Sequence, residues 1–283
     1  METNTNRQIV STDWLAEHLS NPDVAVIDCR FVLGKPGAGL QAYTASHIPG
    51  ALYFDLEHDL SGPKSADGHG GRHPLPDTAS LSRLFSSAGI DETVTVVAYD
   101  DQDLAMASRL WWLLRYMGHD RVVVLDGGWQ AWQRKEYPVT SEITTRPARR
   151  FTASPRPEML ATVEDVKHRS EQAALIDSRA KERYSGQQET IDRKAGHIPG
   201  ALHYFFKENL TADGTLRSTP ELRERFTPLA NQQELIIYCG SGVTACVNLL
   251  ALHQIGRPDA RLYLGSWSDW CSYDNPVATG DQP

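Results

Sequence analysis

The sequence has few of the features that would set it apart from ordinary globular proteins. No apolar run approaches the ~18 residues that a membrane-spanning helix needs, so no membrane is expected among its partners. Its four cysteines form no C-x-x-C pair, which argues against a disulfide scaffold and against a structural metal site. Lys and Arg number 28 against 36 Asp and Glu, and the formal net charge of −8 disfavours non-specific binding to nucleic acid.

The start of the sequence also lacks the apolar core of a signal peptide. Apart from Met1, the residues of Met1–Arg7 are all polar or charged. Together with the unpatterned cysteines, this predicts a cytoplasmic protein, in a compartment where a reactive thiol stays reduced.

The residue with the most chemical promise is Cys239, which stands in a Gly-rich loop. The apolar run Leu235–Tyr238 predicts a buried strand before it, and Ala245–His253 predicts a helix after it. A loop between a strand and a helix N-terminus can direct several backbone N–H groups at one point, and the helix dipole adds positive potential. Both effects favour a thiolate over a thiol. The sequence therefore predicts an activated sulfur nucleophile.

Two other interpretations of the cysteines can be compared with this one. A cysteine phosphatase needs an arginine at a fixed short distance after its nucleophile to hold phosphate, and that position is Ala245. A free cysteine is most often a small buried hydrophobic residue, and we adopt this interpretation for Cys29, Cys246 and Cys271. A minor redox role stays open for Cys246, because it lies close to Cys239 in the sequence.

The chain contains an internal repeat. The recurring pairs are Val24–Arg30 with Ala173–Arg179, His47–Leu52 with His197–Leu202, Val96–Tyr99 with Leu235–Tyr238, and Val122–Trp132 with Arg261–Trp270. Each copy alternates short apolar runs with amphipathic segments, which is typical of parallel sheets flanked by helices. The repeat predicts an α/β fold of two tandem domains, residues 1–138 and 161–283, joined by a Pro-containing linker at 139–160.

The two copies differ at the predicted nucleophile. In the first copy Asp100 stands where the second has Cys239, and Asp101 and Asp103 follow closely. Three carboxylates fit poorly in a loop that stabilises anions, so the first domain is expected to be catalytically silent. His47 and His197 occur in both copies, and we expect them to be structural. The same holds for the tryptophans of both copies, Trp129, Trp132, Trp267 and Trp270.

The segment Cys239–Thr244 reads C-G-S-G-V-T and resembles the active-site loop of the tandem-domain rhodanese superfamily. Within it, the loop is most similar to the 3-mercaptopyruvate sulfurtransferases, whose pattern is C-G-[ST]-G-V-T. Rhodaneses that use thiosulfate typically carry two cationic residues after the cysteine, where this chain has Gly240 and Ser241. The resemblance implies two rhodanese-like domains over essentially the whole chain, and chemistry that needs no metal or organic cofactor.

The resemblance also implies roles for particular residues. The backbone of Gly240, Gly242, Val243 and Thr244 would cradle the sulfur. Arg183, in Glu182–Tyr184, matches the family's [GA]-R-[FY] arginine that binds the anionic donor, although Glu182 replaces the small residue. Arg193 is the candidate for a second substrate arginine, although the family's P-R-x-G context is missing.

A serine–histidine–acid relay proposed for the family has matching positions here. They are Ser241, His73 and Glu57, with glutamate in place of the family's aspartate. His73 lies in a Gly-rich loop of the first copy, which would have to reach the cysteine.

These residues lead to a hypothesis with two alternatives. The chain is interpreted as a sulfurtransferase that moves sulfur from 3-mercaptopyruvate through a Cys239 persulfide to a thiol or cyanide, releasing pyruvate. The acceptor could be a thioredoxin-like protein or glutathione. The alternatives are a thiosulfate:cyanide sulfurtransferase, and a non-catalytic rhodanese module that carries sulfur or binds partners. The neutral residues after Cys239 favour the first, and the intact cysteine disfavours the last.

Overall fold

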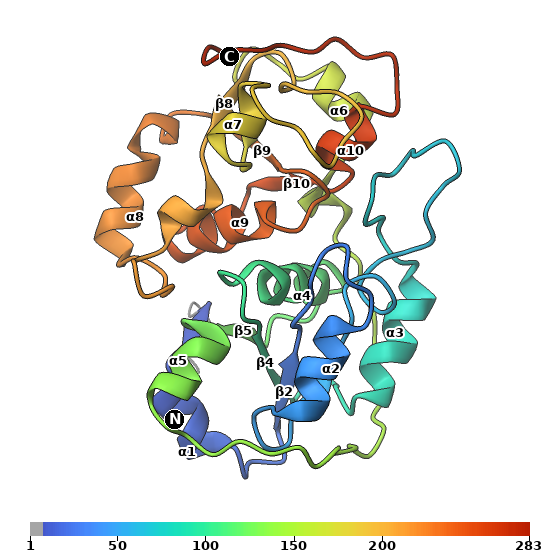
Figure 1. The fold of residues 1–283 in the computed structure, drawn as a ribbon, viewed down its shortest axis with the longest axis vertical. Helices are drawn as coiled ribbons and strands as arrows, with labels where there is room; N and C mark the ends of the chain where they lie inside the picture. The colour runs from blue at the N-terminus through green and yellow to red at the C-terminus, as the bar shows by residue number, and fades with distance from the viewer. Residues whose placement is uncertain (1–7) are drawn as a thin grey trace. The chain divides into compact units, whose positions relative to one another are not determined.

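The computed structural model describes residues 8–283, which form two compact units (Figure 1). The first unit comprises the described residues up to Gly62, together with Pro76–Arg156 and Ala212–Leu216. The second comprises Pro63–Leu75, Pro157–Thr211 and Arg217–Pro283. The polar segment 1–7, on which the expected compartment partly rests, lies outside the described residues. The domain bounds expected from the repeat stay a prediction, and the units differ from them mainly in where residues 63–75 and 212–216 pack.

The first unit is built on a parallel sheet in the order β1-β5-β4-β2-β3. Its strands are β1 (Ile9–Val10), β2 (Val24–Asp28), β3 (Leu52–Tyr53), β4 (Thr95–Tyr99) and β5 (Val122–Leu125). Its helices are α1 (Thr12–His18), α2 (Ala38–Ala45), α3 (Thr78–Ser87), α4 (Ala105–Tyr116) and α5 (Gly128–Arg134). Strand β2 is buried at every position and β4 at all but its first, as expected for strands covered on both faces.

The second unit repeats this plan, with a parallel sheet in the order β6-β10-β9-β7-β8. Its strands are β6 (Leu160–Ala161), β7 (Ala173–Asp177), β8 (Ala201–His203), β9 (Glu234–Tyr238) and β10 (Arg261–Tyr263). Its helices are α6 (Val163–Lys167), α7 (Lys181–Tyr184), α8 (Thr219–Phe226), α9 (Ala245–Gln254) and α10 (Ser266–Trp270), with short 3-10 turns η1 (Pro157–Met159), η2 (Phe206–Asn209) and η3 (Thr227–Leu229). Because corresponding strands take the same places in both sheets, the predicted duplication and the α/β fold class are confirmed.

Local sequence signals explain where several helices begin. The hydroxyl of Ser11 accepts a hydrogen bond from the N–H of Trp14 at the start of α1. Helix α6 begins with a capping box, in which Thr162 and Asp165 each bind the other's backbone N–H. Such caps pair N–H groups that the first turn of a helix leaves without intrahelical partners.

A buried ion pair marks the carboxyl end of β2 in the first unit and of β7 in the second. Asp28 pairs with Arg30 at 2.7 Å, and Asp177 pairs with Arg179 at 2.6 Å. No side chain of the four is more than 5% exposed. Each guanidinium also lies over an indole ring, at 4.5 Å from the ring centre of Trp129 and 4.6 Å from that of Trp267 in the two units. The duplication therefore extends to the polar groups of the core.

The histidines and tryptophans of both copies have the structural roles expected for them. His47 Nδ1 lies 2.7 Å from the carbonyl oxygen of Tyr43, and His197 Nδ1 lies 2.8 Å from that of Tyr184. Both histidines are fully buried. The four tryptophans are at most 6% exposed; they are Trp129, Trp132, Trp267 and Trp270. Their packing beneath the sheet ends confirms that they belong to the two cores.

The three cysteines interpreted as inert are all buried. Burial and the nearby carboxylate of Asp28 raise the pKa of the Cys29 thiol well above its usual value. Burial raises the pKa of the Cys271 thiol to about 12. Within residues 8–283, no helix combines the length and the apolar character that crossing a membrane would require.

The loop of the first unit that corresponds to the Cys239 loop binds its own side chain. The Asp100 carboxylate accepts hydrogen bonds from the N–H groups of Gln102 (2.8 Å), Leu104 (3.2 Å) and Ala107 (2.8 Å). The sequence interpretation that carboxylates fit such a loop poorly therefore needs one refinement. The loop does present N–H groups to an anion, and the anion is the carboxylate of Asp100 itself.

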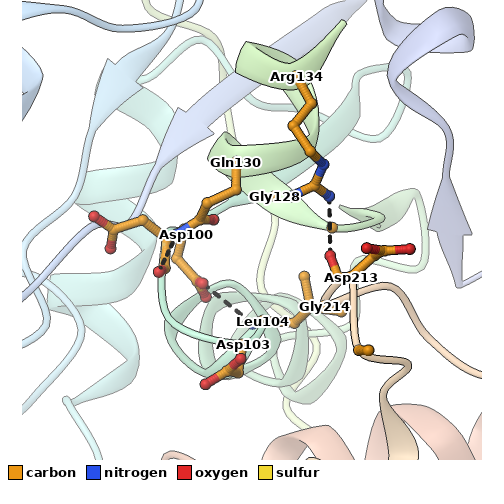
Figure 2. A pocket seen from close by; sticks show the side chains of 11 residues that line it. Asp100, Asp103, Leu104, Gly128, Gln130, Arg134, Asp213 and Gly214 are labelled. Carbon is orange, nitrogen blue, oxygen red and sulfur yellow. Dashed lines mark hydrogen bonds between the residues drawn. The ribbon is translucent and has the colours of Figure 1, made fainter.

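Asp100 also borders a cavity of about 220 Å³ within the first unit (Figure 2). Arg134 and Asp213 line the same cavity, and the Arg134 guanidinium donates to the Asp213 carbonyl at 2.9 Å. Asp100 is only 1% exposed, and burial raises the pKa of its carboxyl from 3.8 to about 6, although the three N–H groups oppose this rise.

This pKa makes the stability of the first unit depend on pH. Because the pKa is higher in the folded state, the contribution of Asp100 is complete below pH ~4 and is lost as the pH rises through about 6. Relative to Asp100→Asn, the wild-type free energy of unfolding should fall by about 3 kcal/mol between about pH 4 and pH 7. Urea titrations across that range measure the difference. A difference between wild type and Asp100→Asn that does not change with pH would contradict the prediction.

Candidate active site

Cys239 directly follows β9, and the first residues of α10 hold its backbone in place. Its N–H donates to Ser266 Oγ (3.1 Å), and its carbonyl accepts from the N–H of Trp267 (3.0 Å). The sulfur lies 4.0 Å from the same Ser266 oxygen. The residue is 1% exposed. The strand–loop–helix setting expected from the sequence is therefore present, and the backbone around the sulfur is fixed by a second element.

Two glycines of the loop meet close neighbours. Gly242 has a φ of +71°, and a Cβ there would lie 2.3 Å from the carbonyl oxygen of Leu264. A Cβ on Gly240 would lie 3.1 Å from Arg72 Nη2 and 3.3 Å from Arg183 Nη1. Glycine at position 240 thus lets two guanidinium groups approach the backbone of the residue next to Cys239.

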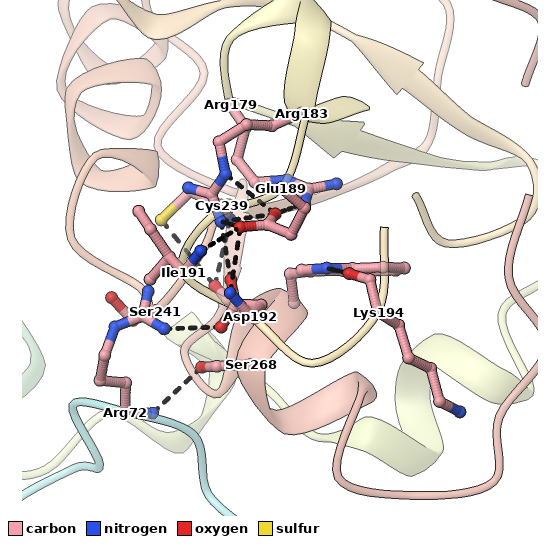
Figure 3. Close-up of polar contacts among 12 residues, drawn as sticks. Arg72, Arg179, Arg183, Glu189, Ile191, Asp192, Lys194, Cys239, Ser241 and Ser268 are labelled. Carbon is pink, nitrogen blue, oxygen red and sulfur yellow. Dashed lines mark hydrogen bonds and ion pairs between the residues drawn. The ribbon is translucent and has the colours of Figure 1, made fainter. Parts of the chain in front are cut away.

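Arg183 is one of these two groups, and it extends from α7. Its guanidinium donates to both carboxylate oxygens of Glu189, with the shortest bond at 2.9 Å, and to Asp192 at 2.7 Å (Figure 3). The side chain is 21% exposed. A loosely solvated surface arginine would show neither these bonds nor this burial. The structure therefore brings Arg183 beside the Cys239 loop, where the sequence analysis expected a donor-binding arginine.

Arg72 is the second group, and sequence reasoning did not identify it. It lies in the segment 63–75, which comes from the first copy and packs in the second unit. Its N–H donates to Ser268 Oγ at 3.0 Å, and its guanidinium donates to Asp192 at 2.6 Å (Figure 3). The only signal in the sequence was its place directly before His73. Nothing local in the chain indicates that it reaches the Cys239 loop.

Glu189 is a buried carboxylate that organises the arginines. It accepts the backbone N–H groups of Ile191 (2.9 Å) and Asp192 (3.0 Å) in addition to its bonds with Arg183. Burial opposes its ionisation, but these two N–H groups and the Arg183 guanidinium lower the pKa of Glu189 below its usual value. Its oxygen also lies 3.5 Å from Arg179, the partner of Asp177 in the core.

Ser241 and His73 are joined in the second unit. Their Oγ and Nδ1 atoms are hydrogen-bonded at 2.8 Å, and the residues are 6% and 3% exposed. Glu57, the third member of the expected relay, belongs to the first unit, where its N–H donates to Asp55. Two of the three expected residues thus meet, and participation of Glu57 stays a prediction.

Arg193 has a different position from Arg183. Its side chain is exposed and lines a cavity of about 200 Å³ within the second unit. Its guanidinium is 3.9 Å from the place that a Cβ of Gly68 would occupy. Arg72 and Asp192 line the same cavity. The described contacts therefore place Arg193 at the rim of the arginine cluster, and its role as a second donor-binding group stays a prediction.

A duplicated parallel α/β fold with Cys239 in a glycine-rich loop at the carboxyl end of β9 defines the class of protein. The rhodanese-like domain model matches residues 11–135 and 162–273. The chain therefore belongs to the rhodanese-like family, and the resemblance first seen in the Cys239 loop is confirmed.

Individual relatives cover almost the whole chain. It is 44% identical to the probable 3-mercaptopyruvate sulfurtransferase of Pseudomonas aeruginosa, over 98% of this chain and 100% of the relative. It is 36% identical to the thiosulfate sulfurtransferase of Rattus norvegicus, over 93% of this chain and 92% of the relative. The crystal structure of the Escherichia coli 3-mercaptopyruvate sulfotransferase SseA matches with a TM-score of 0.80 at 34% identity, over 92% of this chain and 99% of that one. The protein is thus an enzyme of the sulfurtransferase kind.

The Cys239 loop should tolerate no side chain at Gly242. An alanine there has to adopt an unfavourable positive φ and also clashes with the Leu264 carbonyl. Gly256→Ala is the matched control, because Gly256 has a φ of +93° and nothing within 4 Å of its Cβ position. We expect Gly256→Ala to cost about 1–2 kcal/mol of unfolding free energy and Gly242→Ala at least ~3 kcal/mol. Equal losses in denaturant titrations would show that the clash is relieved at no cost.

Proposed function

We propose that this protein transfers sulfur from 3-mercaptopyruvate to a thiol or to cyanide through a persulfide on Cys239, and releases pyruvate. The observation that carries the proposal is the pair of guanidinium groups, Arg72 and Arg183, beside Gly240 in the buried cysteine loop. A small donor with an anionic group can be held there with its sulfur next to Cys239. The names of the full-length relatives support the same reaction.

Arg183 is proposed to bind the donor carboxylate. A guanidinium stays charged at any working pH and can grip a carboxylate through two parallel bonds. Its position is fixed by Glu189, so the donor meets a cation that is already oriented. Preorganisation of this kind reduces the ordering cost of binding.

The proposed chemistry balances without a cofactor. The Cys239 thiolate attacks the donor sulfur, a sulfur–sulfur bond forms, and the donor's carbon–sulfur bond breaks with its electron pair on carbon. The resulting pyruvate enolate takes the proton that the donor thiol carried, and becomes pyruvate. We propose that Ser241 and His73 move this proton, because their Oγ and Nδ1 atoms are 2.8 Å apart beside the loop. An acceptor thiol or cyanide then removes the outer sulfur.

The backbone of residues 240–244 is proposed to stabilise the anionic persulfide. The corresponding loop of the first unit supports this, because there the N–H groups of Gln102, Leu104 and Ala107 bind the Asp100 carboxylate. In both loops the backbone carbonyl of the first residue accepts a hydrogen bond from the backbone N–H of a tryptophan. Trp129 donates to Asp100 at 2.8 Å, and Trp267 donates to Cys239 at 3.0 Å. Dipoles that are already oriented toward an anion cost no reorganisation when the charge appears.

Thiosulfate is the second candidate donor, and one observation favours it. Thiosulfate is a compact dianion, and the residues after Cys239 supply no charge to hold it. Arg72, however, brings a guanidinium to Gly240 from another part of the chain. The rat relative is a thiosulfate sulfurtransferase, which agrees with this alternative. We propose that the acceptor of the outer sulfur is a thioredoxin-like dithiol, glutathione or cyanide.

Steady-state kinetics with both donors and cyanide as the common acceptor test the proposal. We expect kcat/KM for 3-mercaptopyruvate to exceed that for thiosulfate by at least about tenfold, or ~1.4 kcal/mol of transition-state discrimination. Cys239→Ser should abolish turnover of both donors. A preference for thiosulfate would reject the donor assignment, and activity of the serine variant would reject the persulfide.

The proton relay has its own test, because the two donors differ in their need for a proton. Thiosulfate releases sulfite, which is a stable leaving group without protonation. 3-Mercaptopyruvate releases the pyruvate enolate, which must be protonated on carbon to become pyruvate. We expect His73→Asn to lower kcat for 3-mercaptopyruvate by about 10²-fold and to change kcat for thiosulfate by less than about threefold. A similar loss with both donors would mean that His73 only supports the loop.

A further inference from the structure

Asp192 occupies the position between the two guanidinium groups beside the cysteine loop (Figure 3). Its Oδ1 accepts from Arg72 at 2.6 Å and its Oδ2 accepts from Arg183 at 2.7 Å. The side chain is 4% exposed. This carboxylate thus pairs with both of the arginines beside which the anionic group of the donor is proposed to bind.

Glu189 and Asp192 bind Arg183 in different ways. Glu189 holds the Nε and Nη2 edge of Arg183, and it stays anchored by the N–H groups of residues 191 and 192. Arg183 therefore keeps its orientation if the Asp192 carboxylate leaves. Asp192 provides the bridge to Arg72, which Glu189 does not provide in the described contacts.

The residues on either side of Asp192 lie at the surface. Ile191 is 45% exposed, and Thr190 and Arg193 are exposed as well. Rotation about the side-chain bonds of Asp192 would carry its carboxylate toward the cavity that it lines with Arg72, and would leave the backbone N–H groups of Ile191 and Asp192 on Glu189. The cost is two ion pairs, those of Asp192 with Arg72 and with Arg183, which an incoming anion replaces.

We propose that Asp192 is an internal competitor for the donor's anionic group and sets the charge selectivity of the site. The donor displaces the Asp192 carboxylate from Arg72 and Arg183 when it binds. With Asp192 in place, the two positive charges of these arginines are balanced by Glu189 and Asp192, so a donor that binds beside them gains little attraction. Repulsion from Asp192 acts twice as strongly on a dianion as on a monoanion, which disfavours thiosulfate relative to 3-mercaptopyruvate.

This inference relies on the proposed function for the identity of the donor, but the competition concerns any small anion at the same place. Its test therefore uses pyruvate as the monoanion and sulfate as the dianion, neither of which has to be turned over. Failure of the proposed function would appear in the kinetics of the wild type, and failure of this inference in the binding of these two anions.

The experiment is calorimetric titration of wild type and Asp192→Asn at fixed ionic strength and pH. We expect Asp192→Asn to bind pyruvate about tenfold more tightly than wild type, and sulfate with a clearly larger gain. Glu182→Gln is the matched control, because it removes one exposed negative charge from the helix that carries Arg183. It should change both affinities by less than about twofold.

Asp192→Glu keeps the charge and should bind neither anion more tightly. Asp192→Ser removes the charge in a smaller side chain, and provides the same comparison should the asparagine variant not fold. Unchanged or weaker binding of both anions in the uncharged variants would overturn the proposal, since Asp192 would then hold the arginines in place for the donor. An equal gain for pyruvate and sulfate would overturn the part that concerns charge selectivity.

Discussion

The buried pair between Asp177 and Arg179 supports the rest of the site. It fixes the guanidinium at the end of β7, where the same group donates to the Gly196 carbonyl at 2.7 Å and lies over Trp267 of α10. Glu189 lies 3.5 Å from this guanidinium and in turn orients Arg183. Removing one partner of a buried ion pair costs about 3–5 kcal/mol, because the other charge is left without compensation. The orientation of the arginine next to Cys239 thus depends on a core interaction that touches no substrate.

The first unit has the same core ion pair and a similar anion-binding loop, but it has a carboxylate where the second unit has Cys239. Asp28 and Arg30 repeat the pair, and the loop after β4 still directs N–H groups at an anion. The anion is the carboxylate of Asp100, which is covalently part of the loop and has no exchangeable sulfur. The loop of the first unit thus binds an anion with its backbone while carrying a carboxylate in the place of the thiol. Fold and chemistry are independent at this position.

Local patterns were enough to predict the two sheets, the strand before Cys239 and the structural histidines. Apolar periodicity and the repeat report directly on which residues are buried in each copy. Arg72 and Asp192 could not be predicted in this way. Their contact joins the segment 63–75 of the first copy to a surface turn of the second, and no local propensity reports such a pairing. The meeting of Ser241 with His73 has the same origin, and only the family resemblance indicated it.

The positive charge beside Cys239 therefore comes from residues that the fold brings to the loop, and not from the loop itself. Gly240 and Ser241 are neutral, and the sequence alone indicates a loop without cations. In the structure, Arg72 and Arg183 bring their guanidinium groups beside Gly240, where a Cβ would lie 3.1 Å and 3.3 Å from them. The net charge beside this loop follows from the balance between the two guanidinium groups and the carboxylates that pair with them, Glu189 and Asp192.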